Sequence, residues 1–243
     1  MRSFRAIVRK ELGMLLLSPV GYITAAIFWS ASGWTFLHTA RVQSGTTVQL
    51  EALQMVSVLV WLPVLITVVC MRLFSEEKRS GTIETLLTSP VKDVEVVLGK
   101  YCGALIYVIL ATIPAVSGIW LLARAAPGIE GVDPVAMLGG GLILVLITMS
   151  CTAIGLLVSL LTRNQIVAAI CCFWAIWLPF MVKPLVQAVP FVRHQTLERL
   201  SVEEHVLQYT GGMIQLPLAV MYVSVTAFLL FAAVRILESR RWL

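Results

Sequence analysis

Six stretches of mostly apolar residues follow one another along the chain, and polar segments of unequal length separate them. They cover residues 20–37, 55–71, 104–123, 135–161, 166–179 and 213–236. A helix needs about 20 predominantly apolar residues to cross the hydrocarbon core of a bilayer, so each stretch predicts a transmembrane helix. The alternation of period two that a transmembrane β-barrel requires is absent from the sequence. The pattern therefore predicts an all-α polytopic membrane protein, a bundle of six transmembrane helices in one domain over residues 1–243.

Two of the apolar stretches have features of their own. The fifth is short for a span and runs into Pro179, so we expect residues 179–192 to turn back as a re-entrant or interfacial hairpin. The fourth carries small residues on one face, which allow helix backbones to approach closely. These residues are Thr148, Thr152, Gly155 and Ser159. The three glycines at 139–141 predict a flexible outer start of the same helix.

The first 17 residues combine basic side chains with the apolar period of a helix. The basic residues are Arg2, Arg5, Arg9 and Lys10, and the apolar face is formed by Phe4, Ile7, Val8, Leu12, Leu15 and Leu16. This pattern predicts an N-terminal amphipathic helix over residues 1–17 at the membrane surface, which Pro19 ends before the first span. An ordinary basic flank that fixes topology is the alternative. We expect no signal peptide here, because the apolar run continues too far without a convincing small-residue cleavage site.

Composition and charge position agree with a membrane protein. Hydrophobic residues make up 59% of the chain and charged residues 13%, against roughly 45–50% and about 25% in soluble domains. Of the 18 lysines and arginines, 13 fall in the terminal segments, in residues 72–100 and at Arg163. By the positive-inside rule these segments and both termini are cytoplasmic, and the long connection 183–212 is extracytoplasmic. The net charge of +5 therefore lies at membrane edges and indicates a bilayer rather than nucleic acid as partner.

The predicted spans lack charged residues in their central parts, and this absence limits the functions that the chain can have. No Asp, Glu, Lys, Arg or His occupies the central part of a predicted span, although ion-coupled carriers use such groups. Energy for transport must then come from elsewhere, and the Walker A motif of P-loop ATPases is missing. A passive channel or secondary carrier with a regulatory cytosolic loop is the alternative. A membrane enzyme using His194 and His205 is a third possibility, but a solvated external helix explains that segment more simply.

Residues 72–100 form the densest polar segment, with 10 of the chain's 31 charged side chains. Gly81 interrupts the charges and Thr82 can cap a short helix that Ser89 and Pro90 end. The apolar face of this helix is formed by Ile83, Leu86 and Leu87. The face either packs on the protein's own inner surface or fills a groove of a cytosolic partner. The residues alone leave both interpretations open.

The same segment carries a series of short motifs, E-E-K, G-T-x-E-x-L-L, S-P-V and G-K. This series resembles the first cytoplasmic loop of ABC type-2 transporter permeases. The matching residues are Glu76, Glu77, Lys78, Gly81, Thr82, Glu84, Leu86, Leu87, Ser89, Pro90, Val91, Gly99 and Lys100. The N-terminal stretch RKELGMLLLSPVGYI resembles the first segment of the same family. Within the family, the gliding-motility-associated permeases are the most similar group.

The resemblance implies a mechanism and a set of partners. Two permease chains, identical or related, would pair in the bacterial cytoplasmic membrane, and each would dock on a separate cytosolic ABC ATPase subunit. ATP and Mg²⁺ would bind to that partner, so this chain would hold no cofactor or metal and would not be an enzyme. The expected ATPase-coupling residues are Glu76, Glu77, Arg79, Gly81, Thr82, Ile83, Glu84, Leu86, Leu87 and Pro90. The resemblance implies that the direction would be export, and the lack of charge in the spans favours a lipid-linked, polymeric or amphiphilic cargo.

Overall fold

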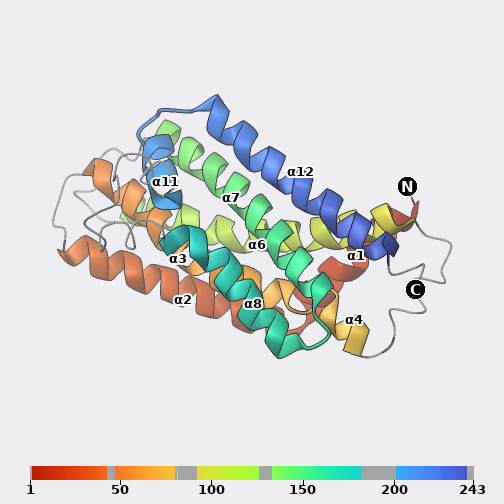
Figure 1. Ribbon diagram of the computed structural model, residues 1–243. Coiled ribbons are helices and arrows are strands. Elements are labelled where there is room, and N and C mark those ends of the chain that lie inside the picture. The colour runs from red at the N-terminus through yellow and green to blue at the C-terminus, as the bar shows by residue number, and fades with distance from the viewer. Residues whose placement is uncertain are drawn as a thin grey trace.

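The computed structural model describes residues 2–42, 47–79, 81, 92–125, 133–181 and 201–239. Within these ranges the regular secondary structure is helical (Figure 1), and the predicted all-α fold is confirmed. The elements are α1 (Arg2–Leu17), α2 (Pro19–Val42), α3 (Thr47–Cys70), α4 (Ser75–Arg79), α6 (Asp93–Ala125), α7 (Pro134–Leu161), α8 (Gln165–Trp177), the 3₁₀ helix η1 (Leu178–Met181), α11 (Val202–Thr210) and α12 (Leu216–Ser239).

The described part of the chain contains fewer full-length spans than the six predicted. In the described ranges four helical segments are long and apolar enough to cross a membrane, namely Leu50–Arg79, Asp93–Trp120, Pro134–Leu161 and Leu216–Ser239. A fifth is reached only if α1 and α2, bent by 67° at their junction, count as one span. The fifth predicted stretch forms a shorter apolar helix, Gln165–Met181. The count of six is therefore not confirmed, and residues 182–192 of the predicted hairpin lie outside the described residues.

The bend between α1 and α2 follows from the local sequence. Pro19 is the first residue of α2, a position where its missing N–H costs nothing because that N–H has no helical acceptor. The N–H of Gly21 donates to Ser18 O, and a Cβ on Gly21 would overlap the carbonyl group of Leu15. Pro19 thus ends α1 as predicted, and the missing side chain of Gly21 permits the sharp turn.

The helix α3 forms the centre of the bundle and packs against α2, α6, α7, α8 and α11 (Figure 1). Its side chains Leu62 and Ile66 are fully buried. Hydrophobic transfer does not drive helices together inside a bilayer, so close packing and interhelical hydrogen bonds must hold these contacts. Three such bonds join α2 to α6: Trp29 Nε1 to Ala111 O at 2.7 Å, Tyr107 Oη to Gly21 O at 2.6 Å, and one between Thr24 Oγ1 and Tyr107 Oη at 3.2 Å.

The small residues of α7 are packing positions, as predicted. A Cβ on Gly155 would lie 2.8 Å from the Cys70 side chain of α3. Thr148, Thr152 and Ser159 are all buried. This face of α7 therefore lies directly against the central helix.

The glycines at 139–141 are not a flexible start of the helix, because all three lie within α7. A Cβ on Gly139 would overlap the backbone oxygen of Tyr209 in α11, and one on Gly140 would lie 2.8 Å from the Thr210 side chain. We expected the segment around His205 to form a solvated external helix. This expectation is wrong in part, because α11 buries one face against α7 and α3. Gly139 and Gly140 allow this approach, whereas a Cβ on Gly141 would meet no atom within 4 Å.

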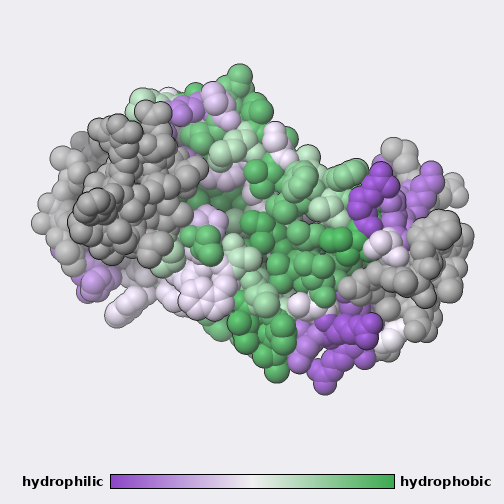
Figure 2. Space-filling model, viewed as in Figure 1, coloured by the Kyte–Doolittle hydropathy of each residue, from purple (hydrophilic) through white to green (hydrophobic). Residues whose placement is uncertain are grey.

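The two ends of the bundle differ in what they contain. The start of α1, the end of α12 and the short helix α4 lie at one end, which we call the α4 end, and α11 lies at the other (Figure 1). Figure 2 shows apolar residues across the middle of the visible face and hydrophilic residues gathered toward both ends. This distribution fits a multi-pass protein whose middle section lies in lipid.

Candidate functional site

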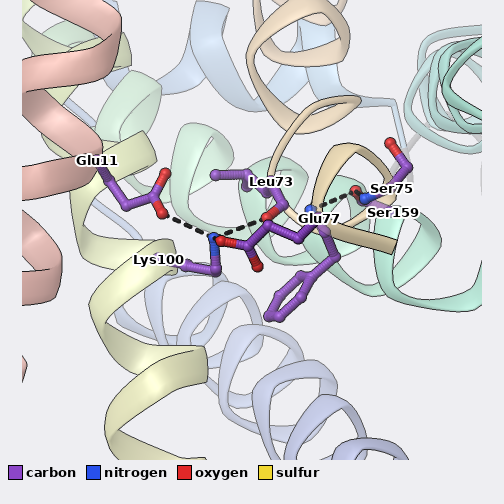
Figure 3. Close-up of polar contacts among 7 residues, drawn as sticks. Glu11, Leu73, Ser75, Glu77, Lys100 and Ser159 are labelled. Atoms are coloured by element: carbon purple, nitrogen blue, oxygen red, sulfur yellow. Dashed lines mark hydrogen bonds and ion pairs between the residues drawn. The ribbon is translucent and has the colours of Figure 1, made fainter. Parts of the chain in front are cut away.

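The candidate site is a buried ion-pair network at the α4 end of the bundle (Figure 3). Lys100 of α6 donates hydrogen bonds to Glu11 Oε1 in α1 at 2.7 Å, to Glu77 Oε1 in α4 at 2.9 Å and to Leu73 O at 2.8 Å. The Lys100 side chain is 3% exposed and that of Glu11 5%. We call these four residues the polar joint, because they connect α1, α4 and α6 with the segment that follows α3.

Two glycines of α6 bring Glu11 to Lys100. An ideal Cβ on Gly99 would lie 2.7 Å from Ile7 Cγ2, and one on Gly103 would lie 2.7 Å from Glu11 Cβ. Because neither glycine has a side chain, α1 can pack along α6 at a short distance. Of the predicted apolar face, Ile7, Leu12 and Leu15 pack against the core, whereas Leu16 is exposed. The position of α1 at a membrane surface stays a prediction.

The buried charge of Lys100 is tolerated because each of its N–H donors has an acceptor. A lysine ammonium has three N–H donors, and three acceptors surround Lys100 in this structure. The Phe74 ring centroid lies 5.2 Å from the ammonium nitrogen, within the range of a cation–π contact. Burying a charge costs several kcal/mol even after relaxation, so such a group persists only where its partners are complete.

The segment between α3 and α4 is also fixed to the end of α7. Ser159 Oγ accepts hydrogen bonds from Phe74 N at 3.1 Å and from Ser75 N at 3.3 Å. Lys78 Nζ, in α4, donates to Leu160 O, which like Ser159 belongs to α7. The first part of residues 72–100 is therefore bound to α7 as well as to α1 and α6.

The predicted coupling residues are placed in part. Glu77 belongs to the polar joint, whereas Glu76 and Arg79 are exposed on α4. Gly81 has φ of +73°, a left-handed conformation that glycine adopts without strain, so the chain turns just beyond α4. The remaining six lie outside the described residues, and the coupling helix stays a prediction. These six are Thr82, Ile83, Glu84, Leu86, Leu87 and Pro90.

Sequence reasoning missed Glu11 and Lys100 as site residues. It began the third span at residue 104 and left Lys100 in a loop, but α6 begins at Asp93 and Lys100 is buried within it. The signal was present in the two motifs K-E-L and G-K, which place one acidic and one basic residue beside apolar runs. Charges of opposite sign at such positions can pair when the two segments meet.

The structure gives no support to the enzymatic alternative. His205 is buried, and its Nδ1 lies 2.8 Å from Tyr222 Oη, a hydrogen bond that joins α11 to α12. His194 lies outside the described residues. Across the described part of the chain, His, Cys, Asp and Glu residues form no group of three that could hold a metal ion.

Comparison with known proteins gives one family match. The model of a family described as "ABC-2 family transporter protein" matches residues 10–178, which is more than two thirds of the chain. The matched region runs from the second half of α1 through α8 and contains every residue of the polar joint. No curated protein matches the chain.

Proposed function

Because the chain belongs to the ABC-2 family of transporter proteins, we propose that it is the membrane-spanning permease subunit of an ABC exporter. Two permease chains pair in a bacterial cytoplasmic membrane, and each docks on a separate cytosolic ATPase that binds ATP and Mg²⁺. The observation that carries this proposal is the family match over residues 10–178. The four or five apolar helices of the described chain are consistent with it.

The ATPase binds at the α4 end of the bundle, which is the cytoplasmic side. Two observations support this orientation. Both ends of the chain carry basic residues, and the first and last described helices reach the same end as α4 (Figure 1). Lysine and arginine near span ends favour the cytoplasmic side. The exposed residues Glu76 and Arg79 of α4, together with residues 82–87, form the contact with the ATPase.

The polar joint transmits the movement of the ATPase to the membrane helices. The segment 80–91 joins α4 to α6, and Lys100 ties both of its flanks together through Glu77. The bond to Glu11 adds α1 to the same unit. At a rise of 1.5 Å per residue, α6 is about 50 Å long, so a displacement at its cytoplasmic end also moves its outer end.

A pull-down tests the proposal. The tagged chain is isolated from native membranes, and the co-purifying proteins are searched by mass spectrometry for one that carries Walker motifs. The purified complex is then reconstituted, and ATP hydrolysis and substrate-dependent transport are measured for Glu84→Lys and Leu86→Asp. We expect both variants to insert normally but to lose ATPase binding or transport.

Glu238→Lys is the matched control. It reverses a charge at the same end of the bundle, in an exposed ion pair with Arg235. Such a pair contributes about 0–1 kcal/mol, so this variant should behave like the unmodified chain. Absence of an ATPase from the pull-down, or full activity of Glu84→Lys and Leu86→Asp, would overturn the docking proposal.

A further inference from the structure

A cavity of about 830 Å³ opens at the α4 end between α1, α2, α3 and α4. Its walls are of two kinds. Apolar side chains line the part between α1, α2 and α3, among them Leu15, Leu17, Val20 and Val68. Charged side chains of α1, α4 and the segment after α3 line the other part. A cavity of this size can hold a ligand of several hundred Å³. Its apolar and charged walls match a molecule with an apolar tail and a polar head.

Arg72 lines the charged part of this cavity. Its Nε is buried, and among the described residues no acceptor binds it. A buried N–H group without an acceptor loses its hydration and gains nothing in return, so such groups usually have a partner. The planar guanidinium offers two parallel N–H donors that match the oxygens of a phosphate or carboxylate. Arg72 is therefore the group that an anion in the cavity would satisfy.

The other charges of the cavity do not take this role from Arg72. Lys100 directs its donors to Glu11, Glu77 and Leu73 O, and in each carboxylate it is the Oε1 atom that accepts the Lys100 hydrogen bond. Lys10 adds a second cation to the lining, and Glu76 is exposed. The full lining carries three cations and three carboxylates and is balanced in charge, so the case for an anion rests on Arg72, whose buried Nε has no acceptor among the described residues.

We propose that this cavity binds an anionic amphiphile with a phosphate headgroup. The phosphate lies on the Arg72 guanidinium, and the acyl chain lies along the apolar walls between α1, α2 and α3. The apolar part of the lining distinguishes such a molecule from free phosphate, which has no group to place there. The site belongs to this chain alone, so the proposal does not depend on the ATPase or on the transported substrate.

Native mass spectrometry of the purified chain in detergent tests the proposal. The probes are dioleoyl phosphatidylglycerol, dioleoyl phosphatidylcholine and inorganic phosphate. We expect phosphatidylglycerol to bind more tightly than phosphatidylcholine, and inorganic phosphate at the same concentration not to displace it. Arg72→Gln should weaken phosphatidylglycerol binding at least tenfold. Arg163→Gln is the matched control, because Arg163 is exposed between α7 and α8 and does not line the cavity.

A second pair of variants tests the apolar part of the cavity and covers the case in which Arg72→Gln does not fold. Gly13 lines the cavity, and a Cβ there would meet no atom within 4 Å. Gly13→Leu should therefore fill the cavity and weaken binding, whereas Gly33→Leu, equally unobstructed in α2, should not. Equal binding by Gly13→Leu and Gly33→Leu, or by Arg72→Gln and Arg163→Gln, would overturn the proposal. Displacement by inorganic phosphate would show a simple anion site instead.

Discussion

Lys100→Met provides the sharpest test of the polar joint. The substitution keeps the length of the side chain but leaves the carboxylates of Glu11 and Glu77 without their ammonium partner at distances of 2.7 and 2.9 Å. Removing one partner of a buried ion pair costs about 3–5 kcal/mol, because the remaining charge stays buried. We expect a loss in this range in the free energy of unfolding, measured by SDS titration and by thermal unfolding in detergent.

The same substitution in a background without the two charges should cost much less. In Glu11→Gln/Glu77→Gln, the Lys100 ammonium is itself unpaired, so Lys100→Met removes a buried charge instead of stranding two. The effects of residues in one network are not additive, and we expect a coupling energy of about 2–3 kcal/mol. Arg235→Met breaks an exposed pair and should cost about 1 kcal/mol or less.

The reasoning is refuted if Lys100→Met costs the same in both backgrounds within about 0.5 kcal/mol. Such additivity would mean that the carboxylates do not sense the ammonium. A loss from Lys100→Met no larger than that from Arg235→Met would likewise show that burial at this position carries no electrostatic penalty.

Three further substitutions test the packing around the polar joint. Gly103→Leu should separate α1 from α6 and lower the melting temperature, because even a Cβ there would lie 2.7 Å from Glu11 Cβ; an unchanged melting temperature would contradict the close packing. Gly13→Ala in the open part of α1 should instead stabilise the chain by about 0.5–1 kcal/mol, and destabilisation would show that the position is crowded. Ser159→Ala removes the acceptor of two buried backbone N–H groups and should cost about 1–3 kcal/mol, with faster hydrogen exchange of those two amides; unchanged exchange would count against this anchor.

Sequence reasoning predicted the helices well where their evidence is local. The predicted span 135–161 and the structural helix Pro134–Leu161 differ by one residue at the start, and 213–236 corresponds to Leu216–Ser239. Hydropathy averaged along the chain is enough to locate these two helices, because each helix must present apolar residues to its surroundings. The predicted stretch 20–37 also lies within α2, but α2 alone does not qualify as a full span, because Ser30, Ser32 and Thr35 lower its mean hydropathy. These three side chains bond to their own helix backbone.

The polar joint was harder to predict from the sequence, because it depends on contacts between residues that are far apart in the chain. Hydropathy treats Lys100 as a residue that must lie outside the membrane helix, and only the arrival of Glu11 and Glu77 makes its burial tolerable. The buried face of α11 was missed for a similar reason. The contact depends on the bare backbone at Gly139, which receives the oxygen of Tyr209, and no local pattern of either segment predicts the other.

A buried ion pair is weak evidence for a stabilising role, since apolar side chains of similar volume often stabilise as well or better. The geometry of the polar joint indicates instead that it fixes the relative orientation of the three helices. Apolar groups would hold α1, α4 and α6 together at many angles, whereas three hydrogen bonds to one ammonium fix a single arrangement. We therefore expect Glu11→Gln/Glu77→Gln/Lys100→Met to fold with little loss of stability and to bind its ATPase. In reconstituted vesicles it should hydrolyse ATP while transport falls, because movement of α4 no longer carries α1 and α6 with it. Transport equal to that of the unmodified chain would show that the polar joint serves folding and not transmission.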